Sequence, residues 1–497
     1  QNCLIKFSVK MDKKSIFFVL FVLILSNVYA QSFPINDLYN TYDNFKDNRI
    51  TIKRFTHSDL LPIIKEKANN KIFKFEQVGK SIEGRSINKL TIGKGDITVL
   101  AWSQMHGDEA TATMALLDLF NFFENKTQFT ELKELLLNKL TIHFIPMVNP
   151  DGAEKFTRRN RAKIDLNRDA LRRTNPESKI LYKLQKKLKP KFGFNLHDQG
   201  SLYTAGNTFK TATISVLLPA YNINKDINEV RSNGMKVIVD MHKALNKFIP
   251  GHIGRYDDEF EPRAFGDNFV KWGTSSILIE SGGWKDDYEK QFVRKLNYLA
   301  ILTALHSIAT NNYNNNSIDD YFAIPENSNM LFDMLLRNVK TVIADSVLTV
   351  DIGINRNEIT DKNKKAFFKS SIVEFGDLST FFGNDEFCFD SMTVVPGKVY
   401  DTIFDTIEEL ENINFEELLS SGYCYIKVKN IPKNLQFTKY PINIVLPDFT
   451  PPTEISLGNS ANFVILENNK TRYTIINGFL YDILIKKSYI YNSVIFK

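Results

Sequence analysis

The feature that most constrains the fold is an alternation, across residues 35–311, between short apolar runs and longer amphipathic ones. The apolar runs have the near-continuous character of strands covered on both faces: Ile97–Trp102, Leu140–Val148, Phe192–Leu196 and Ser276–Glu280. The stretches between them have helical periodicity: Ala110–Phe123, Glu131–Asn138, Ser178–Leu188 and Gln291–Ala309. This order predicts an α/β domain over residues 31–311.

The chain changes character after this region. Residues 311–320 are polar, rich in Asn and without periodicity, so we place a linker at 312–320. Residues 321–497 are expected to form a β-rich, antiparallel, sandwich-like module with one or two short helices. Its expected strands are Val339–Ile354, Tyr423–Val428, Phe463–Glu467, Tyr473–Ile476 and Phe479–Ile485. Asn477-Gly478, between the last two, predicts a hairpin turn.

The first 30 residues have the pattern of a secretory signal peptide. A basic start at Met11–Lys14 precedes the apolar run Ile16–Leu25, and small residues lead to Ala30. The run is about half as long as the roughly 20 residues that a membrane span requires. We therefore expect cleavage after Ala30 and a secreted or periplasmic chain without a transmembrane segment. Residues 1–10 are interpreted as an over-extended reading frame upstream of the signal peptide.

Composition narrows the class of protein further. With 43% hydrophobic and 24% charged residues, the chain is not collagen, a disordered tail or a polytopic membrane protein. The formal charge of +6 falls to +3 without residues 1–30, which gives no indication of a nucleic-acid partner. After that segment only Cys388 and Cys424 remain, too few for a disulfide scaffold, and whether they pair stays open.

A first candidate site lies in residues 99–112, VLAWSQMHGDEATA. His106 and Glu109 are three residues apart, where an apolar strand gives way to a helix. At that spacing both side chains can face one point, and a neutral imidazole with a carboxylate suits zinc. Alone, the pattern also fits a helix whose acidic residues interact with its dipole, so both interpretations stay open at this point.

Two more candidates follow strands. His197 comes directly after Phe192–Leu196, at the carboxyl end of a buried strand, where open α/β sheets bind ligands. Glu280 ends another strand before Gly282-Gly283; partial burial would raise its pKa toward the range of a general base, although such a residue can also cap a turn. Of the other histidines, His143 is predicted to be a core residue, and His57, His242 and His306 to be solvated, while His252 is undecided.

The segment 149–169, NPDGAEKFTRRNRAKIDLNRD, is rich in arginine. A charge run is usually a solvated face, yet Ile164 and Leu166 could anchor this one against a core. Arg is the side chain best shaped to bind a carboxylate with two donors. A two-His, one-Glu zinc site beside arginines would suit cleavage of a peptide that ends in a free carboxylate.

Taken together and in order, these motifs resemble the carboxypeptidase A-like zinc metallocarboxypeptidases over residues 35–311. GKSIEGRSI at 79–87, MHGDE at 105–109 and NPDG at 149–152 are similar to family motifs. The block from Arg158 and Asn160 to Asp165, Asn167 and Arg168 is also similar. The resemblance implies a mixed, mostly parallel twisted sheet with helices on both faces, and one zinc ion per chain.

The resemblance also implies roles for individual residues. His106, Glu109 and His197 correspond to the three zinc ligands, and Glu280 to the general base and proton shuttle. Asp165 corresponds to the acid that orients the first His ligand. Arg158 corresponds to the arginine that stabilises the oxyanion, with Arg161 as a close rival. Two further residues, Asn167 and Arg168, correspond to the pair that holds the substrate's terminal carboxylate.

Some positions depart from the family pattern. Asp108 stands where many members have Arg, so the outer peptide subsite is expected to differ. Tyr256 is the expected counterpart of the mobile substrate-capping Tyr, although it could equally be a surface aromatic. The specificity pocket has no clear match within 256–267; Arg263 and Phe265 lie near its expected place.

The function that these residues imply is a secreted, zinc-dependent carboxypeptidase acting on peptides with a free C-terminal carboxylate. Two alternatives stay open. One keeps the zinc site but acts on cell-wall peptides or γ-glutamyl bonds; the other is an inactive peptide-binding protein. The C-terminal module faintly resembles the small β-sandwich beside amidohydrolase barrels, and its expected role is structural or docking.

Overall fold

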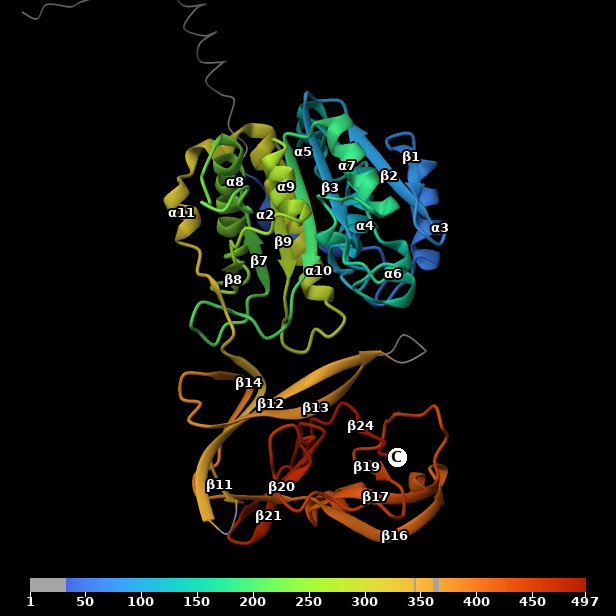
Figure 1. Ribbon diagram of the computed structural model, residues 1–497, viewed down its shortest axis with the longest axis vertical. Coiled ribbons are helices and arrows are strands. Elements are labelled where there is room, and N and C mark those ends of the chain that lie inside the picture. Colours follow the sequence, from blue (N-terminus) through green and yellow to red (C-terminus); the bar gives the residue numbers. More distant parts are fainter. Residues whose placement is uncertain (1–32, 344–345, 361–365) are drawn as a thin grey trace, which may run out of the picture.

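A computed structural model describes residues 33–343, 346–360 and 366–497, so the predicted signal peptide lies outside the described residues (Figure 1). The chain forms two parts stacked along the long axis of the molecule: residues 33–324, here called the N-terminal part, and the remainder, the C-terminal part. Within the described residues, no helix combines the length and apolar character needed to cross a membrane.

An eight-stranded sheet organises the N-terminal part, in the order β1-β2-β4-β3-β5-β9-β7-β8. Its central pairs β4–β3, β3–β5 and β5–β9 are parallel, as is β7–β8 at one edge, and the other pairs are antiparallel. The strands are β1 (Lys74–Lys80), β2 (Ser86–Gly93), β3 (Ile97–Ser103), β4 (Leu140–Ile145), β5 (Phe192–Asp198), β7 (Ile214–Leu217), β8 (Ile253–Arg255) and β9 (Ser275–Ser281). The mixed, mostly parallel sheet that the sequence predicts is confirmed.

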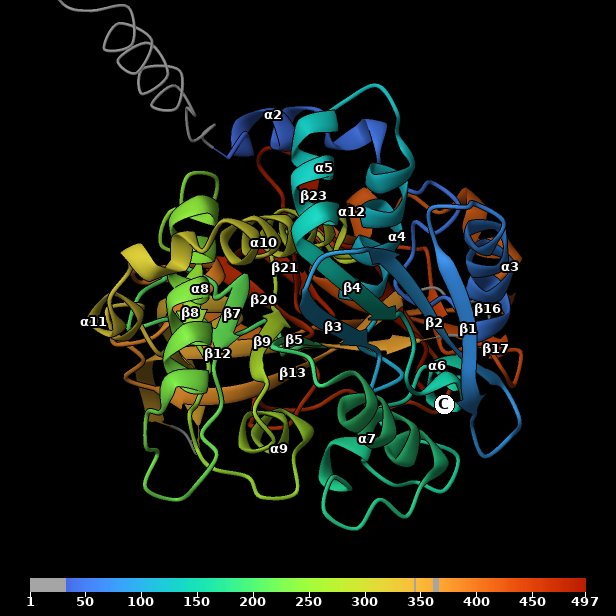
Figure 2. The ribbon, with the colours of Figure 1, turned by 90° about the horizontal axis from the view of Figure 1, so that it is seen from above.

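Helices cover both faces of this sheet (Figure 2). Successive residues of β3 point to opposite faces: Val99 and Ala101 join the larger hydrophobic core, and Leu100 and Trp102 join the smaller one. The larger core is covered by α2 (Ile35–Asn40), α3 (His57–Ala68), α4 (Thr111–Glu124), α5 (Thr130–Lys139), α8 (Glu229–Leu245) and α10 (Gln291–Thr310). The smaller core is covered by α7 (Pro176–Leu188) and α9 (Phe265–Lys271).

The predicted helices and central strands agree with the structure within a few residues. Gln291–Ala309, for example, was expected to be helical and α10 spans Gln291–Thr310. His143 lies within β4, buried and hydrogen-bonded to the Thr91 hydroxyl at 2.8 Å, as predicted for a core residue. The prediction for His57 is wrong: its ring is buried and contacts the carbonyl oxygen of Ser86 at 3.0 Å, because α3 folds back onto the start of β2.

The C-terminal part consists of several sheets, confirming a strand-rich region. The largest contains β11 (Leu331–Ile343), β12 (Ser346–Thr360), β13 (Ala366–Gly376), β14 (Phe382–Cys388), β15 (Thr393–Pro396), β20 (Phe463–Glu467), β21 (Lys470–Ile476), β22 (Phe479–Asp482) and β23 (Lys487–Ser488). A second has β16 (Lys398–Thr406), β17 (Tyr423–Asn430) and β19 (Asn443–Val445). Short pieces are α12 (Phe415–Ser420) and the paired β18 (Phe437–Thr438) and β24 (Ser493–Val494).

Two expectations for this part need correction. Val339–Ile354, predicted to be one strand, is the closed end of the β11–β12 hairpin, in which Val339 pairs with Val350. The sheets are also not wholly antiparallel, because β16, β17 and β19 run parallel and β14 runs parallel to β11. Cys388 is exposed and Cys424 is buried, and neither forms a disulfide in the described part of the chain.

The two parts are joined by a connecting segment and also by strand pairing. The stretch predicted as a linker, residues 312–320, contains the 3-10 helix η3 (Asn312–Asn315) and the start of α11 (Ile318–Phe322). The chain then forms β10 (Asn327–Ser328), which pairs with β6 (Thr204–Ala205) of the N-terminal part. The loops at the carboxyl ends of β5 and β9 therefore face the C-terminal part (Figure 1).

Candidate metal centre and substrate cavity

The loop between β3 and α4 carries His106 and Glu109, and packing against a second loop fixes its shape. Gln104 has a positive φ of 46°, and its side-chain amide donates to the Gly107 carbonyl at 3.0 Å. Gly107 lies so close to the NPDG segment that an added Cβ would be 2.1 Å from the carbonyl carbon of Gly152. A glycine is therefore required where the chain turns toward Glu109.

Two of the motifs that carry the resemblance form the support beneath this loop. Asp151 of NPDG is buried and accepts hydrogen bonds from the Ser81 hydroxyl at 2.6 Å and from Arg85 at 2.8 Å. Both donors belong to the segment 79–87. These residues contact each other and do not line the cavity described below. Their role is therefore to support the loop that carries His106 and Glu109.

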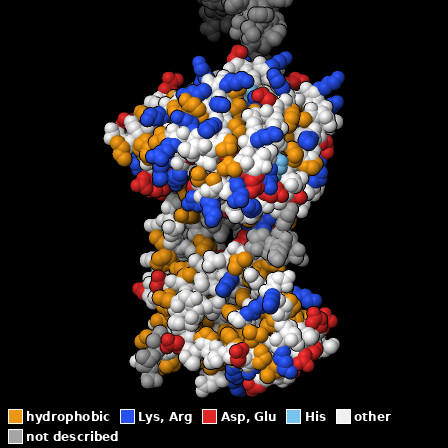
Figure 3. All heavy atoms as spheres, turned by 45° about the vertical axis from the view of Figure 1, so that its right-hand side comes forward, with side chains coloured by type: hydrophobic (Ala, Val, Ile, Leu, Met, Phe, Trp, Pro, Cys, Tyr) orange, Lys and Arg blue, Asp and Glu red, His pale blue; other side chains and the backbone are white. Residues whose placement is uncertain are grey.

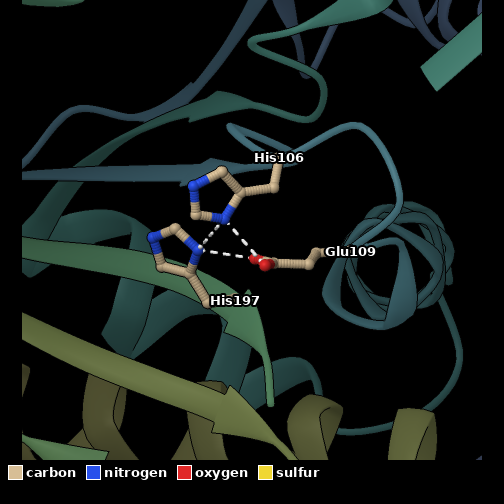
Figure 4. A group of neighbouring side chains, drawn as sticks. All are labelled: His106, Glu109 and His197. Atoms are coloured by element: carbon tan, nitrogen blue, oxygen red, sulfur yellow. Dashed lines mark hydrogen bonds and ion pairs between the residues drawn. The ribbon is translucent and has the colours of Figure 1, made fainter. Parts of the chain in front are cut away.

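His106, Glu109 and His197 converge on one point (Figure 4). Glu109 lies between the two imidazoles, 2.7 Å from Nδ1 of His106 and 2.6 Å from Nδ1 of His197. Their candidate ligand atoms all lie within 4.8 Å of one another, and all three residues are buried. Two imidazole nitrogens only 3.2 Å apart beside a carboxylate form a donor set that fits a zinc ion.

Asp165 orients the first imidazole. Its Oδ1 lies 3.0 Å from Nε2 of His106, which leaves Nδ1 directed toward Glu109 and His197. Burial would lower the pKa of His106, but the carboxylates of Glu109 and Asp165 outweigh that effect and raise the pKa to about 9. Burial would raise the pKa of Glu109, yet the two imidazoles hold it well below its usual range.

Glu280 lies beside the cluster because of strand register. β5 and β9 are parallel neighbours, and Glu280 is the partner of His197 in the ladder. The carboxyl group is buried, and Oε2 has no hydrogen-bond partner within the described residues. Burial, followed by the charges of Glu109 and Asp198, raises the pKa of Glu280 well above its ordinary value, which suits a group that takes up a proton.

The structure distinguishes the two rival arginines. Arg158 lies 3.0 Å from Oε1 of Glu109 and 3.0 Å from Oδ2 of Asp165, so its guanidinium is beside the candidate metal ligands. Arg161 instead pairs with Glu83 at 2.6 Å and is absent from the lining of the cavity. Of the two, only Arg158 can reach a substrate atom next to the cluster.

A cavity of about 680 Å³ contains the cluster, Glu280 and both members of the predicted carboxylate-binding pair. The side-chain oxygen Oδ1 of Asn167 accepts a hydrogen bond from the backbone N–H of Phe265 at 2.9 Å, while the side-chain nitrogen Nδ2 has no partner within the described residues. Arg168 is half exposed and paired with Glu261 at 3.2 Å. A substrate carboxylate that binds Arg168 would therefore compete with Glu261.

Of the remaining candidate site residues, some line the cavity and others do not. Tyr256 lines the cavity, and burial together with the charge of Glu280 raises its pKa to about 12, so its hydroxyl remains a donor. Phe265 is wholly buried in the smaller core, and Arg263, which pairs with Glu261, is not among the residues that line the cavity. Asp267 lines the cavity instead; it lies at the end of the stretch 256–267 in which the specificity pocket was expected, but no motif singles it out.

Two comparisons of the sequence with known proteins match the first part of the chain. Residues 64–214 match the family model described as zinc carboxypeptidase. Carboxypeptidase SOL1 of Arabidopsis thaliana is 27% identical over 154 residues, which is 29% of this chain and 29% of that relative.

Two solved structures are also similar. A metallo-carboxypeptidase from Burkholderia cenocepacia has 16% identity and a TM-score of 0.42, covering 52% of this chain and 70% of its own. A carboxypeptidase A from Helicoverpa armigera has 16% identity and a TM-score of 0.41, covering 60% of this chain and 87% of its own. Residues 64–214, which hold His106, Glu109 and His197, match the zinc carboxypeptidase family model, and the resemblance that their motifs indicate is confirmed.

Proposed function

We propose that the protein is a zinc metallocarboxypeptidase that removes the last residue from peptides with a free C-terminal carboxylate. The observation that carries this proposal is the single cavity in which a His-Glu-His cluster, a buried carboxyl group at Glu280 and the side chains of Arg158 and Arg168 meet. Because the N-terminal region has the pattern of a signal peptide, we further propose that the enzyme acts outside the cytoplasm.

Each group in the cavity has a chemical role in this reaction. A zinc ion held by His106, Glu109 and His197 would supply a Lewis acid and lower the pKa of a water molecule. Glu280 accepts the proton of the attacking water and returns it to the leaving amine, a task that suits its raised pKa. Arg158 donates to the carbonyl oxygen as negative charge develops on it.

Asn167 and Arg168 determine which peptide bond reacts. Nδ2 of Asn167 and the guanidinium of Arg168 would hold the terminal carboxylate, so the last peptide bond lies beside Glu280. The pairing of Arg168 with Glu261 keeps the guanidinium at the cavity before substrate binds. Hydrogen bonds with a charged partner on both sides are the stronger ones, which favours a peptide acid over an amide.

A pair of peptides that differ only at the C-terminus tests this proposal. The peptide acid should lose one residue at a time, and its C-terminal amide should react roughly 30- to 1000-fold more slowly in kcat/KM, from a loss of about 2–4 kcal/mol. Arg168→Ala should remove most of that preference, and Arg161→Ala, an arginine outside the cavity, should retain it. Products are identified by mass spectrometry.

Other outcomes distinguish the alternatives. Equal rates on acid and amide in the wild type exclude the carboxypeptidase assignment and leave a zinc hydrolase of another kind. Cleavage of γ-glutamyl-linked cell-wall peptides in preference to α-linked ones favours the amidase alternative. Binding of peptides without turnover, by zinc-loaded protein, identifies an inactive peptide-binding protein.

A further inference from the structure

A second cavity, of about 750 Å³, lies between the N-terminal and C-terminal parts. Five residues line both this cavity and the one that holds the cluster: Glu109, Asp198, Gln199, Gly200 and Tyr203. The two cavities therefore border each other at Glu109, one of the candidate metal ligands, and at the residues that follow His197. Figure 3 shows the molecule narrowing where the two parts meet.

The C-terminal part supplies one wall of this second cavity, here called the upstream slot. Its lining includes Asn329 next to β10, Asn355 and Asn357 on β12, Phe368 on β13 and Asp385 on β14. Asn329 and Asn357 are exposed, and their side chains make no hydrogen bond within the described residues. Amide side chains in this condition can pair with the backbone of a bound peptide, because each offers both a donor and an acceptor.

Direct contacts hold this wall against the N-terminal part. Glu358 on β12 accepts from Lys53 at 2.6 Å and also pairs with Arg54. Asp385 pairs with Lys285 at 2.8 Å, and the ring of Tyr288 packs 4.8 Å from that of Phe368.

A further connection lies beside the shared lining. Asn327 accepts from the Ser215 hydroxyl and donates to Gln199, both at 2.8 Å. Since Gln199 lines both cavities, β10 is attached directly to the boundary between them.

The chemistry of the upstream slot is aromatic and acidic. Partly buried rings of Phe156, Tyr203, Trp284 and Tyr288 line it on the N-terminal side. Its lining has eight carboxylates against five Lys and Arg side chains. The rings favour segments with apolar side chains. The excess of carboxylates attracts basic segments, leaves neutral ones unaffected and repels acidic ones.

We propose that the upstream slot binds the residues that precede the scissile bond, so the C-terminal part is a wall of the substrate site and selects extended, neutral or basic peptides. This inference rests on the proposed function. With the terminal carboxylate at Arg168, a peptide must pass Glu109, and the shared lining there leads into the slot. A chain end that is folded up to its last residues cannot enter between the two walls.

Kinetics on substrates of different length test the proposal. An N-acetylated hexapeptide with lysines upstream should exceed the N-acetylated dipeptide of the same two last residues by roughly tenfold or more in kcat/KM, since remote contacts contribute to catalysis. Replacing those lysines with glutamates should remove much of the advantage. Asn357→Trp, which fills the slot from β12, should bring the ratio of hexapeptide to dipeptide close to one.

Matched variants keep the result interpretable. Asn329→Trp repeats the block from a second exposed position, and Asn434→Trp is the control, an exposed asparagine of the C-terminal part that lines neither cavity. The control should keep the wild-type ratio. Equal rates on both lengths in the wild type, or wild-type ratios in both blocking variants, overturn the inference while leaving carboxypeptidase activity established.

Affinity measurements separate this inference from the proposed function. If zinc-loaded wild type cleaves neither peptide, the proposed function fails, and calorimetric titration of the Glu280→Gln protein decides the inference. The inference is supported if the Glu280→Gln protein binds the hexapeptide more tightly than the dipeptide and if adding Asn357→Trp to this protein removes the difference. Equal affinities for the two lengths overturn it.

Discussion

At the scale of single residues, His197 and Glu280 owe their positions to one register. Each lies one residue before the end of its strand, and the parallel ladder that pairs them places an imidazole and a carboxyl group at the same edge of the sheet. Nε2 of His197 has no hydrogen-bond partner within the described residues, so the position of this ring depends on packing and on what binds Nδ1. Metal content is therefore a direct measure of its role.

Replacing His197 should abolish metal binding. Catalytic zinc sites use three protein ligands, and we expect about one zinc per chain in the wild type and almost none in His197→Ala. His242→Ala, a histidine on α8 far from the cluster in sequence, is the control and should keep its zinc. Elemental analysis of purified proteins measures this, and a wild-type zinc content in His197→Ala would show that the assignment is wrong.

Asp267 should make the preference for the last residue depend on pH. Burial, with smaller effects from neighbouring carboxylates, raises its pKa to about 7. It is neutral below that pH and negative above it, so its attraction for a cationic C-terminal side chain appears only as the pH rises through 7. From roughly one pH unit below the pKa of Asp267 to roughly one pH unit above it, we expect the kcat/KM ratio of Lys-ending to Leu-ending peptides to rise about tenfold at most.

The matched variant separates Asp267 from other titrating groups. Asp267→Asn keeps the shape and can still accept the hydrogen bond that the backbone N–H of Glu261 donates at 2.9 Å. In this variant the ratio should stay nearly constant over the same pH range, with the low value seen in the wild type at acidic pH. The same rise in both proteins would assign the effect to another carboxylate.

At the scale of elements, the hairpin of β21 and β22 shows a turn that local chemistry determines and tertiary contacts use. Asn477 and Gly478 have positive φ values of 50° and 72°, as a tight two-residue turn requires. Asn477 is fully buried, and its side chain accepts from the backbone N–H of Ser370 at 2.8 Å and donates to the carbonyl of Phe368 at 2.7 Å. The turn thus attaches the hairpin to β13.

Asn477→Ala should destabilise the protein through these contacts. The variant leaves a buried N–H on Ser370 without its acceptor, which costs about 1–3 kcal/mol, and Ala tolerates positive φ less well than Asn. Asn469→Ala, at the exposed turn between β20 and β21, also has a positive φ and serves as the control for backbone strain alone. Denaturant unfolding compares the two, and equal losses would mean that the buried hydrogen bonds add nothing.

At the scale of the whole molecule, the two parts share residues at their boundary. We predict from the sequence that residues 31–311 and 321–497 are separate domains, and the stretch between them packs against the N-terminal part. Tyr321 and Ile324 are almost fully buried there, and Asn316 donates to Asp240 at 2.8 Å. We therefore propose that the N-terminal domain extends to β10.

Two truncated chains test where this domain ends. A chain that stops after Asn329 keeps α11 and β10 and should remain soluble and bind zinc. A chain that stops after Asn315 loses the buried side chains of Tyr321 and Ile324 and should be less stable by roughly 3 kcal/mol or more. Thermal unfolding and zinc content measure both, and equal stability of the two would return the boundary to residue 311.

The sequence by itself determined what depends on near neighbours. The apolar runs and helical periodicity identified β3, β5, β9, α4 and α10 within a few residues, because these patterns reflect each element's own burial. The ordered motifs around His106, Glu109 and His197 indicated the resemblance that the family model over residues 64–214 matches, since these residues lie at or beside the ends of elements that such patterns reveal. The turn at Asn477-Gly478 was also predictable, because the conformation of a two-residue turn depends on the turn residues themselves.

Only the tertiary structure decided what depends on residues far apart in the chain. Arg158 and Arg161 differ by three positions, and the packing of their loop places one beside Glu109 and the other beside Glu83. The β11–β12 hairpin looked like one strand because both of its strands are apolar near the turn. The second wall of the cavity comes from β12 to β14, more than 100 residues after β5, and no local pattern encodes which distant surfaces pack together.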